Sequence, residues 1–187
     1  MHKNDSHKNH PHHPHILARL GSHLWSADRQ LRKAFPAASL QHIEQAVTAA
    51  ESGHSGELRV VIEGGLGWAV ASAGASRLPA SLLSRARAVD LFAQLGVWDT
   101  ADNSGVLIYI LMAEHQLEII ADRGIHAKVG EEVWQGIVAD TTVRFRQGDY
   151  EQGVLSAIDA IGTLLRSYFP VTADRNPNEL PNRPLTL

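Results

Sequence analysis

The sequence contains no cysteine among its 187 residues. This absence excludes disulfides, thiolate nucleophiles and cysteine-ligated metal centres. No apolar run reaches the roughly 20 residues that a membrane-spanning helix needs, and the amino terminus has no apolar core of the kind found in signal peptides. We therefore expect a cytoplasmic protein that does not insert into a membrane.

Positive charge is also limited. The chain has 17 Lys and Arg against 20 Asp and Glu, and the basic residues form no stripe, so nucleic acid is not an expected partner. No G-x-S-x-G, Walker or H-E-x-x-H motif is present to supply a nucleophile or a phosphate loop. With 44% hydrophobic residues, the chain is ordinary for a globular protein and long enough to bury a core.

The two ends of the chain differ in composition from its middle. Residues 1–15 hold six of the eleven histidines and predict a disordered tail, whether native or added, that binds Ni²⁺, Cu²⁺ or Zn²⁺ at most loosely. Residues 170–187 are rich in proline and predict a second tail. Between them we expect a helical lead-in over 16–37 and one domain over 38–169.

Apolar spacing predicts the elements of this domain. A helix over 16–34 stops near Pro36, and Ser39 is expected to cap the next helix, which ends at Gly53. Helices are expected over 79–95 and 128–147, and a capping box of Asp149 and Gln152 is expected to open a last one. Strands are predicted over 57–63, 105–112 and 116–122.

This order of elements predicts an α/β fold. The first two strands are separated by a full helix, so we expect them to be parallel, while the third returns as an antiparallel hairpin strand. Helices on both faces of this small mixed sheet give a three-layer αβα sandwich.

Polar residues gather where these strands begin or end. In the predicted topology, the starts of the first two strands and the end of the third share one edge of the sheet, and neighbouring strands are only about 5 Å apart. That edge would carry Glu57, Asp99, Asp102, Asn103 and Asp122, with His54, Arg123 and His126 close by in the chain. Carboxylate and amide oxygens are the ligands that Ca²⁺ and Mg²⁺ prefer, and an arginine can grip a phosphate.

Two other interpretations stay open. Asp, Asn, Ser and Gly before a strand are also the commonest turn residues, so the same residues can simply form turns. A rival site would lie at the opposite edge, where Glu63 and residues 64–67 follow the first strand, because ligands in open α/β sheets bind at the carboxyl ends of strands.

Four segments together resemble a known family: IEQAVTAAESGHSGELRVVIE, WDTADNSGVLIYI, IIADRGI and FRQGDYEQG. In this order they are similar to the TPM domain family, which takes its name from a thylakoid lumen protein, a photosystem II repair protein and a nematode receptor auxiliary protein. The resemblance covers about residues 38–169 and is greatest to short bacterial members that consist of the domain alone.

The resemblance implies an αβα sandwich, an acid phosphatase activity proposed for the family, and calcium or another divalent ion in an acidic cleft. It assigns the cleft to Glu57, Asp102, Asn103 and Asp122. Family members often carry a signal peptide and a membrane anchor, which are not seen in this sequence.

We therefore expect a divalent-cation-binding, phosphatase-like protein. Glu57, Asp102 and Asp122 would ligate the ion, Asn103 would add a carbonyl oxygen, and Asp122 and Arg123 would act in catalysis. His54, Asp99 and His126 are accessory candidates. The alternative is a non-catalytic module that helps assemble a complex with a protein partner not identified by the sequence.

Overall fold

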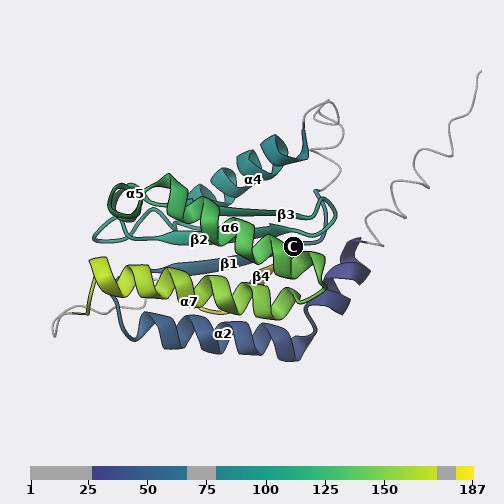
Figure 1. The fold of residues 1–187 in the computed structure, drawn as a ribbon, viewed down its shortest axis with the longest axis horizontal. Helices are drawn as coiled ribbons and strands as arrows, with labels where there is room; N and C mark the ends of the chain where they lie inside the picture. The colour runs from purple at the N-terminus through teal and green to yellow at the C-terminus, as the bar shows by residue number, and fades with distance from the viewer. Residues whose placement is uncertain (1–26, 67–78, 172–179) are drawn as a thin grey trace, which may run out of the picture.

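The computed structural model describes residues 27–66, 79–171 and 180–187 (Figure 1). The predicted histidine-rich tail and residues 16–26 of the lead-in helix lie outside these ranges. Residues 27–34 are helical. They are followed by α2 (Ala37–Glu51), β1 (Leu58–Glu63), α4 (Ala80–Gln94), β2 (Val106–Leu111), β3 (Gln116–Ala121), α5 (Arg123–Val129), α6 (Glu131–Arg146), α7 (Tyr150–Tyr168) and β4 (Leu185–Thr186).

The four strands form one mixed sheet in the order β3-β2-β1-β4. β1 and β2 run parallel, with Leu58 opposite Val106, and β2 and β3 run antiparallel, with Val106 opposite Ala121. The beginnings of β1 and β2 and the end of β3 therefore lie side by side. The predicted mixed sheet is confirmed, and so is the common edge that it implies.

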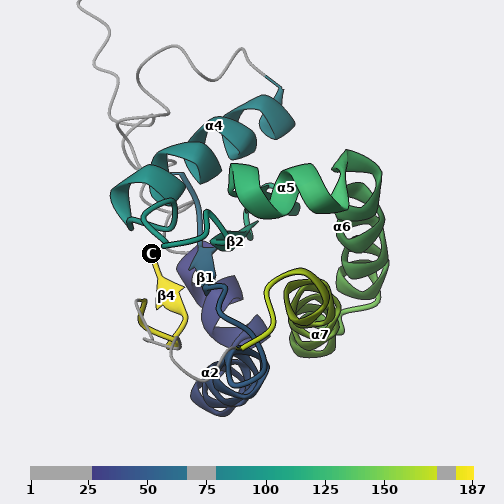
Figure 2. The same ribbon diagram turned by 90° about the vertical axis from the view of Figure 1, so that its left-hand side faces the viewer.

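Helices cover both faces of the sheet, as predicted (Figure 2). Alternate residues of β1 enter two separate apolar clusters. Leu58, Val60 and Ile62 pack in the cluster that contains residues of α2, α6 and α7. Val61 packs with residues of α4 in the other cluster. Burial of each such aliphatic side chain stabilises the folded state by about 1.5–3 kcal/mol. Because every residue of β1 and β2 is buried, these two strands form the centre of an αβα sandwich.

The helix predicted over 128–147 corresponds to α6, Glu131–Arg146, and a separate short helix, α5, precedes it. Asp122 accepts a hydrogen bond of 2.7 Å from the backbone nitrogen of Arg123 and so begins α5, and Gly130, at φ 85°, separates α5 from α6. The periodicity misses α5 because Ile125 is the only buried residue in its seven-residue span.

Neither predicted helix cap makes a side-chain capping hydrogen bond, although Asp149 occupies the N-cap position of α7 as predicted. Pro36, not Ser39, occupies the N-cap position of α2, and the buried Ser39 hydroxyl donates to the Glu151 carboxylate of α7. Asp149 does precede α7, but its side chain makes no capping hydrogen bond. Ser39 joins two helices instead of capping one.

The carboxyl-terminal segment contains a strand that the sequence does not predict. Leu185 and Thr186 of β4 pair in parallel with Val61 and Ile62 of β1, within residues 170–187, where we expected a tail. Within the described ranges, no helix is long and apolar enough to cross a membrane.

Candidate functional site

The loop that leads into β2 forms a tight turn. The backbone nitrogens of Asn103 and Ser104 donate to the carbonyl oxygen (3.2 Å) and the hydroxyl (2.9 Å) of Thr100. Asn103 has φ 53°, a left-handed conformation that asparagine tolerates well. A Cβ at Gly105 would lie 1.8 Å from the Val97 carbonyl oxygen, so only glycine fits there. Asp102 and Asn103 are thereby held partly exposed at the tip of the turn.

The beginning of α5 packs directly against this turn. The backbone nitrogen of Ile125 donates to the Asn103 carbonyl oxygen (3.2 Å), and that of Asp122 donates to the Gly105 carbonyl oxygen (2.8 Å). A Cβ at Gly124 would lie 2.5 Å from the Asp102 carbonyl oxygen and 2.6 Å from that of Asn103. The absence of a side chain at Gly124 allows this close approach.

Polar side chains link three segments at this edge of the sheet. Arg123 Nε donates to Asn103 Oδ1 at 3.0 Å, and the Ser55 hydroxyl donates to Asp102 Oδ2 at 3.4 Å. Ser55 was not among the predicted site residues, although the HSGE motif contains it. We call the group of Ser55, Asp102, Asn103, Asp122 and Arg123 the acidic rim.

One oxygen of the acidic rim is poorly satisfied. Asp122 Oδ1 accepts the capping hydrogen bond of α5, whereas Asp122 Oδ2 is buried and has no hydrogen-bond partner among the described residues. A buried polar atom without a partner costs about 1–3 kcal/mol. A water molecule or a cation at this position would remove that cost.

Glu57 does not join the rim contacts that the structure shows. Its side chain is 3% exposed, and Oε2 accepts a hydrogen bond of 3.2 Å from the backbone nitrogen of Leu180. Glu57 precedes β1 and contacts the carboxyl-terminal segment. Within residues 27–66, 79–171 and 180–187, no three His, Asp or Glu side chains are grouped closely enough to hold a metal ion by themselves.

The three accessory candidates lie in different surroundings. His54 is fully buried, and its Nδ1–H donates to the Gly56 carbonyl oxygen at 2.9 Å. Burial lowers the pKa of His54 to about 4, the charge of Arg166 adds to this lowering, and the Gly56 hydrogen bond opposes it. His54 is therefore neutral near pH 7. Asp99 and His126 are exposed on the loop before the turn and on α5.

The rival position at the other edge of the sheet is occupied by an internal ion pair. Glu63 is 5% exposed and accepts from the Tyr109 hydroxyl (2.7 Å), and Arg87 Nε and Nη2 donate to its two oxygens (3.0 and 3.3 Å). Burial and the neighbouring Glu63 carboxylate raise the pKa of Tyr109 well above its usual range. This cluster joins α4 to the sheet. Residue 67 of the adjoining loop lies outside the described residues.

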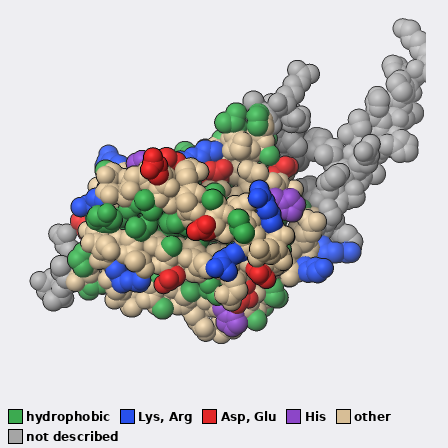
Figure 3. All heavy atoms as spheres, in the orientation of Figure 1, with side chains coloured by type: hydrophobic (Ala, Val, Ile, Leu, Met, Phe, Trp, Pro, Cys, Tyr) green, Lys and Arg blue, Asp and Glu red, His purple; other side chains and the backbone are tan. Residues whose placement is uncertain are grey.

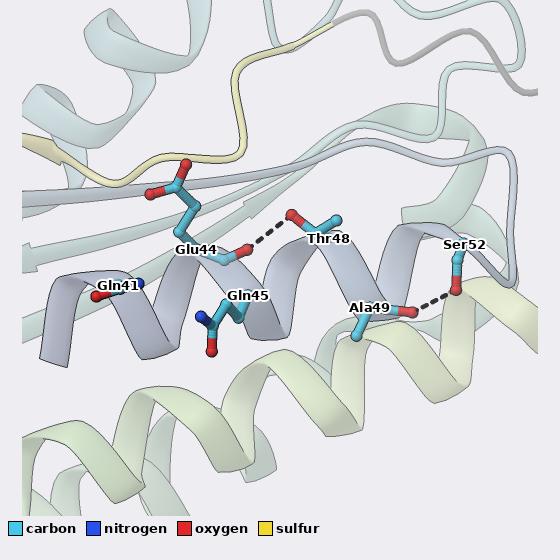
Figure 4. Close-up of a pocket in the computed structure, with 6 residues that line it drawn as sticks. All are labelled: Gln41, Glu44, Gln45, Thr48, Ala49 and Ser52. Carbon is cyan, nitrogen blue, oxygen red and sulfur yellow. Dashed lines mark hydrogen bonds between the residues drawn. The ribbon is translucent and has the colours of Figure 1, made fainter. Parts of the chain in front are cut away.

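A separate surface hollow of about 570 Å³ lies on α2 (Figure 4). It is lined by Gln41, Glu44, Gln45, Thr48, Ala49 and Ser52. The hydroxyls of Thr48 and Ser52 donate to carbonyl oxygens of their own helix, so they do not converge on a ligand.

On the face that carries α6 and α7, acidic and basic side chains are interspersed (Figure 3).

Fold and geometry together define an αβα domain with an acidic rim at the amino ends of its two parallel strands. The chain belongs to the TPM domain family, whose model matches residues 30–164. The resemblance inferred from the sequence is therefore confirmed.

A solved structure agrees with this assignment. The chain is similar to the BA42 protein of the psychrophilic bacterium Bizionia argentinensis, known from an NMR structure, with a TM-score of 0.68 and 29% sequence identity. The similarity covers 82% of this chain and 95% of that one. A comparison with curated proteins found no match.

Proposed function

We propose that this TPM-domain protein binds a divalent cation at the acidic rim and acts there as a phosphatase-like hydrolase. The observation that carries the proposal is the buried Oδ2 of Asp122, which has no hydrogen-bond partner among the described residues and lies beside the turn that holds Asp102. Two carboxylates suit Mg²⁺, which takes one or two protein carboxylates and completes its octahedral shell with water or phosphate oxygens. Ca²⁺ takes 6–8 oxygen ligands and would need more than these two carboxylates.

The chain's own residues have distinct roles in this proposal. Asp102 and Asp122 hold the cation, which when bound would polarise a phosphoryl oxygen and acidify a water molecule. Arg123 is fixed through Nε by Asn103, so its outer guanidinium nitrogens remain for a phosphate oxygen. Asn103 acts mainly as the positioning partner of Arg123, and Glu57 is no longer part of the proposed ligand set.

Thermal unfolding with Ca²⁺, with Mg²⁺ and with EDTA tests cation binding. A cation that binds only the folded state raises the melting temperature, by the equivalent of about 2.7 kcal/mol at 100 times its Kd. We expect this rise in the wild type and in Asp99→Asn, whose carboxylate is exposed outside the rim. Asp122→Asn should lose it. The absence of any cation-dependent rise in the wild type would refute the site.

Hydrolysis of p-nitrophenyl phosphate across pH tests the phosphatase proposal separately. Activity should depend on the added cation and fall in Asp102→Ala and Asp122→Asn, but not in the matched Asp99→Ala control. Activity that survives in both rim variants comes from a contaminant, and then the phosphatase proposal is wrong even if the cation binds.

A non-catalytic interaction module is the second candidate, and the surface near α4 favours it. Leu82 and Val89 lie seven residues apart on α4 and are 57% and 48% exposed, and Trp98, just after this helix, is 53% exposed; exposed apolar side chains can mark contacts with other proteins. This candidate predicts no hydrolysis by the wild type with any cation, together with loss of complex formation in Leu82→Ser and Val89→Ser.

A further inference from the structure

The helix α4 presents a line of apolar side chains on the side that faces away from the sheet. Its buried residues, Ser84, Ala88 and Leu91, mark the side that packs on the sheet. Among the described residues, no helix or strand covers the opposite side (Figure 1, Figure 2). Four exposed apolar residues lie along that opposite side and are called the α4 stripe: Leu82, Ala86, Val89 and Ala93.

The spacing of the α4 stripe is that of a seam between two helices. Successive members are four, three and four residues apart, which is the spacing of the d and a positions of a heptad repeat. The two large members, Leu82 and Val89, occupy d positions, and the two alanines occupy a positions. The stripe is about 16 Å long at 1.5 Å per residue. Such a surface fits a second helix of the same spacing, and the α4 helix of another copy of the chain has it.

Two charged residues flank the α4 stripe, one on each side. Arg85 precedes Ala86 at a g position, and Asp90 follows Val89 at an e position. In two parallel helices in register, a g position lies across the seam from the e position five residues further along the other helix, so Arg85 of each copy faces Asp90 of the other. In an antiparallel pair, both arginines would lie on one side of the seam and both aspartates on the other. The charges therefore favour a parallel pair.

Contacts with the sheet hold α4 in place without any partner. Arg85 Nη1 donates to the Ile119 carbonyl oxygen at 2.9 Å and lies 3.5 Å from Glu118 Oε2, yet its side chain is 47% exposed. Arg87 of the same helix donates to both oxygens of Glu63. Two isolated helices of this length would be marginal in water. Because α4 is already folded on the sheet, pairing does not carry the entropic cost of ordering it.

We propose that the α4 stripe is the interface of a homodimer, in which a second copy of this chain packs its own α4 in parallel and Arg85 of each copy pairs with Asp90 of the other. One helix of 15 residues from each copy makes a small interface, below the about 1,200–2,000 Å² that stable complexes bury. The dimer is therefore weak, with a Kd on the order of 100 µM. The proposal rests on the surface that favours an interaction module, for which it names the partner, and not on cation binding at the acidic rim.

Sedimentation equilibrium of the full chain tests the dimer. EDTA is present, so that metal ions cannot link chains through their histidine-rich ends. We expect the mean mass to rise from that of the monomer toward that of a dimer between about 10 µM and about 1 mM protein. Val89→Arg places two like charges in the seam and should raise the Kd at least about tenfold. The matched control is Val143→Arg on α6, where the valine is 50% exposed, and it should associate as the wild type does.

A wild type that stays monomeric over this range would overturn the proposal and leave the cation site untouched. Self-association that Val89→Arg keeps and Val143→Arg loses would also overturn it, because the interface would then lie on α6.

Exchange of the flanking charges tests the orientation of the pair. Asp90→Lys and Arg85→Glu should each weaken self-association, because like charges then meet across the seam. Mixed in equal amounts, the two variants should form a heterodimer about as tight as the wild-type dimer, since the introduced glutamate faces the introduced lysine. A mixture that associates no better than either variant alone would overturn the parallel pair.

Disulfide trapping keeps the test decisive if Arg85→Glu, which also loses the hydrogen bond to Ile119, does not fold. The chain has no cysteine, so a single introduced cysteine reports on its own position alone. In the parallel pair Val89 of one copy lies beside Val89 of the other. Val89→Cys should therefore form a cross-linked dimer on mild oxidation at least about tenfold faster than Val143→Cys. Equal rates for the two variants would contradict the proposed seam.

Discussion

Replacing Gly124 by alanine should push the beginning of α5 away from the turn that carries Asp102 and Asn103. The added Cβ would lie 2.5 and 2.6 Å from two backbone carbonyl oxygens, whereas ordinary contacts lie at 3.4–4 Å. Neither oxygen can rotate away, because they belong to the tight turn at Asp102 and Asn103. Overpacking of this kind costs about 1–3 kcal/mol, partly offset by about 0.5–1 kcal/mol from the higher helix propensity of alanine.

Gly136→Ala is the matched control for this substitution. Gly136 lies in α6, and a Cβ there would meet nothing within 4 Å, so alanine should stabilise the protein by about 0.5–1 kcal/mol. Urea unfolding followed by tryptophan fluorescence, to which the buried Trp134 contributes, measures the stability of both variants. If Gly124→Ala is as stable as Gly136→Ala, the close packing of α5 on the turn is refuted.

Three further predictions concern stability. Asp122→Ala removes the N-cap of α5 and should lower the free energy of unfolding in urea by about 1 kcal/mol, whereas asparagine also caps helices, so Asp122→Asn should lose much less. Equal losses in the two variants would contradict the cap. Tyr109→Phe should cost about 1–2 kcal/mol, because the hydroxyl bonded to the buried Glu63 is lost, and an unchanged urea midpoint would argue against that contact. Burial lowers the pKa of His54 in the folded protein from 6.5 to about 4. The free energy of unfolding that comes from neutral His54 is therefore complete above pH 6.5 and should fall by about 3 kcal/mol between pH 6.5 and 4. A His54→Gln variant that loses as much stability over this range would exclude His54 as the cause.

The central part of the fold could be predicted because its strands are apolar on both faces. Residues 106–112 alternate between the two clusters, so both faces of β2 are apolar and the sequence shows a continuous apolar run that marks a central strand. The parallel and hairpin pairings follow from connection lengths alone. α5 and β4 could not be predicted, since α5 buries one side chain and β4 depends on contacts with Arg59, which is far away in the sequence.

The candidate site could be predicted only to the level of a sheet edge. The topology brings the segments around Ser55, Asp102 and Asp122 together, as the hydrogen bonds of the acidic rim show. It does not say which way a side chain at the beginning of a strand points, and Glu57 points toward the carboxyl-terminal segment. Nor could it reveal that Asp122 caps a helix while its other oxygen is buried and accepts no hydrogen bond from the part of the chain that the structure describes.

The most direct test of a cation site at the acidic rim is an NMR titration of the nitrogen-15-labelled protein with Mg²⁺ and with Ca²⁺. Both ions prefer oxygen ligands, so the histidine-rich terminus should not interfere. The account predicts saturable amide shifts confined to residues 102–105 and 122–125 and absent in Asp122→Asn. An unchanged spectrum, or shifts centred elsewhere in the chain, would contradict it.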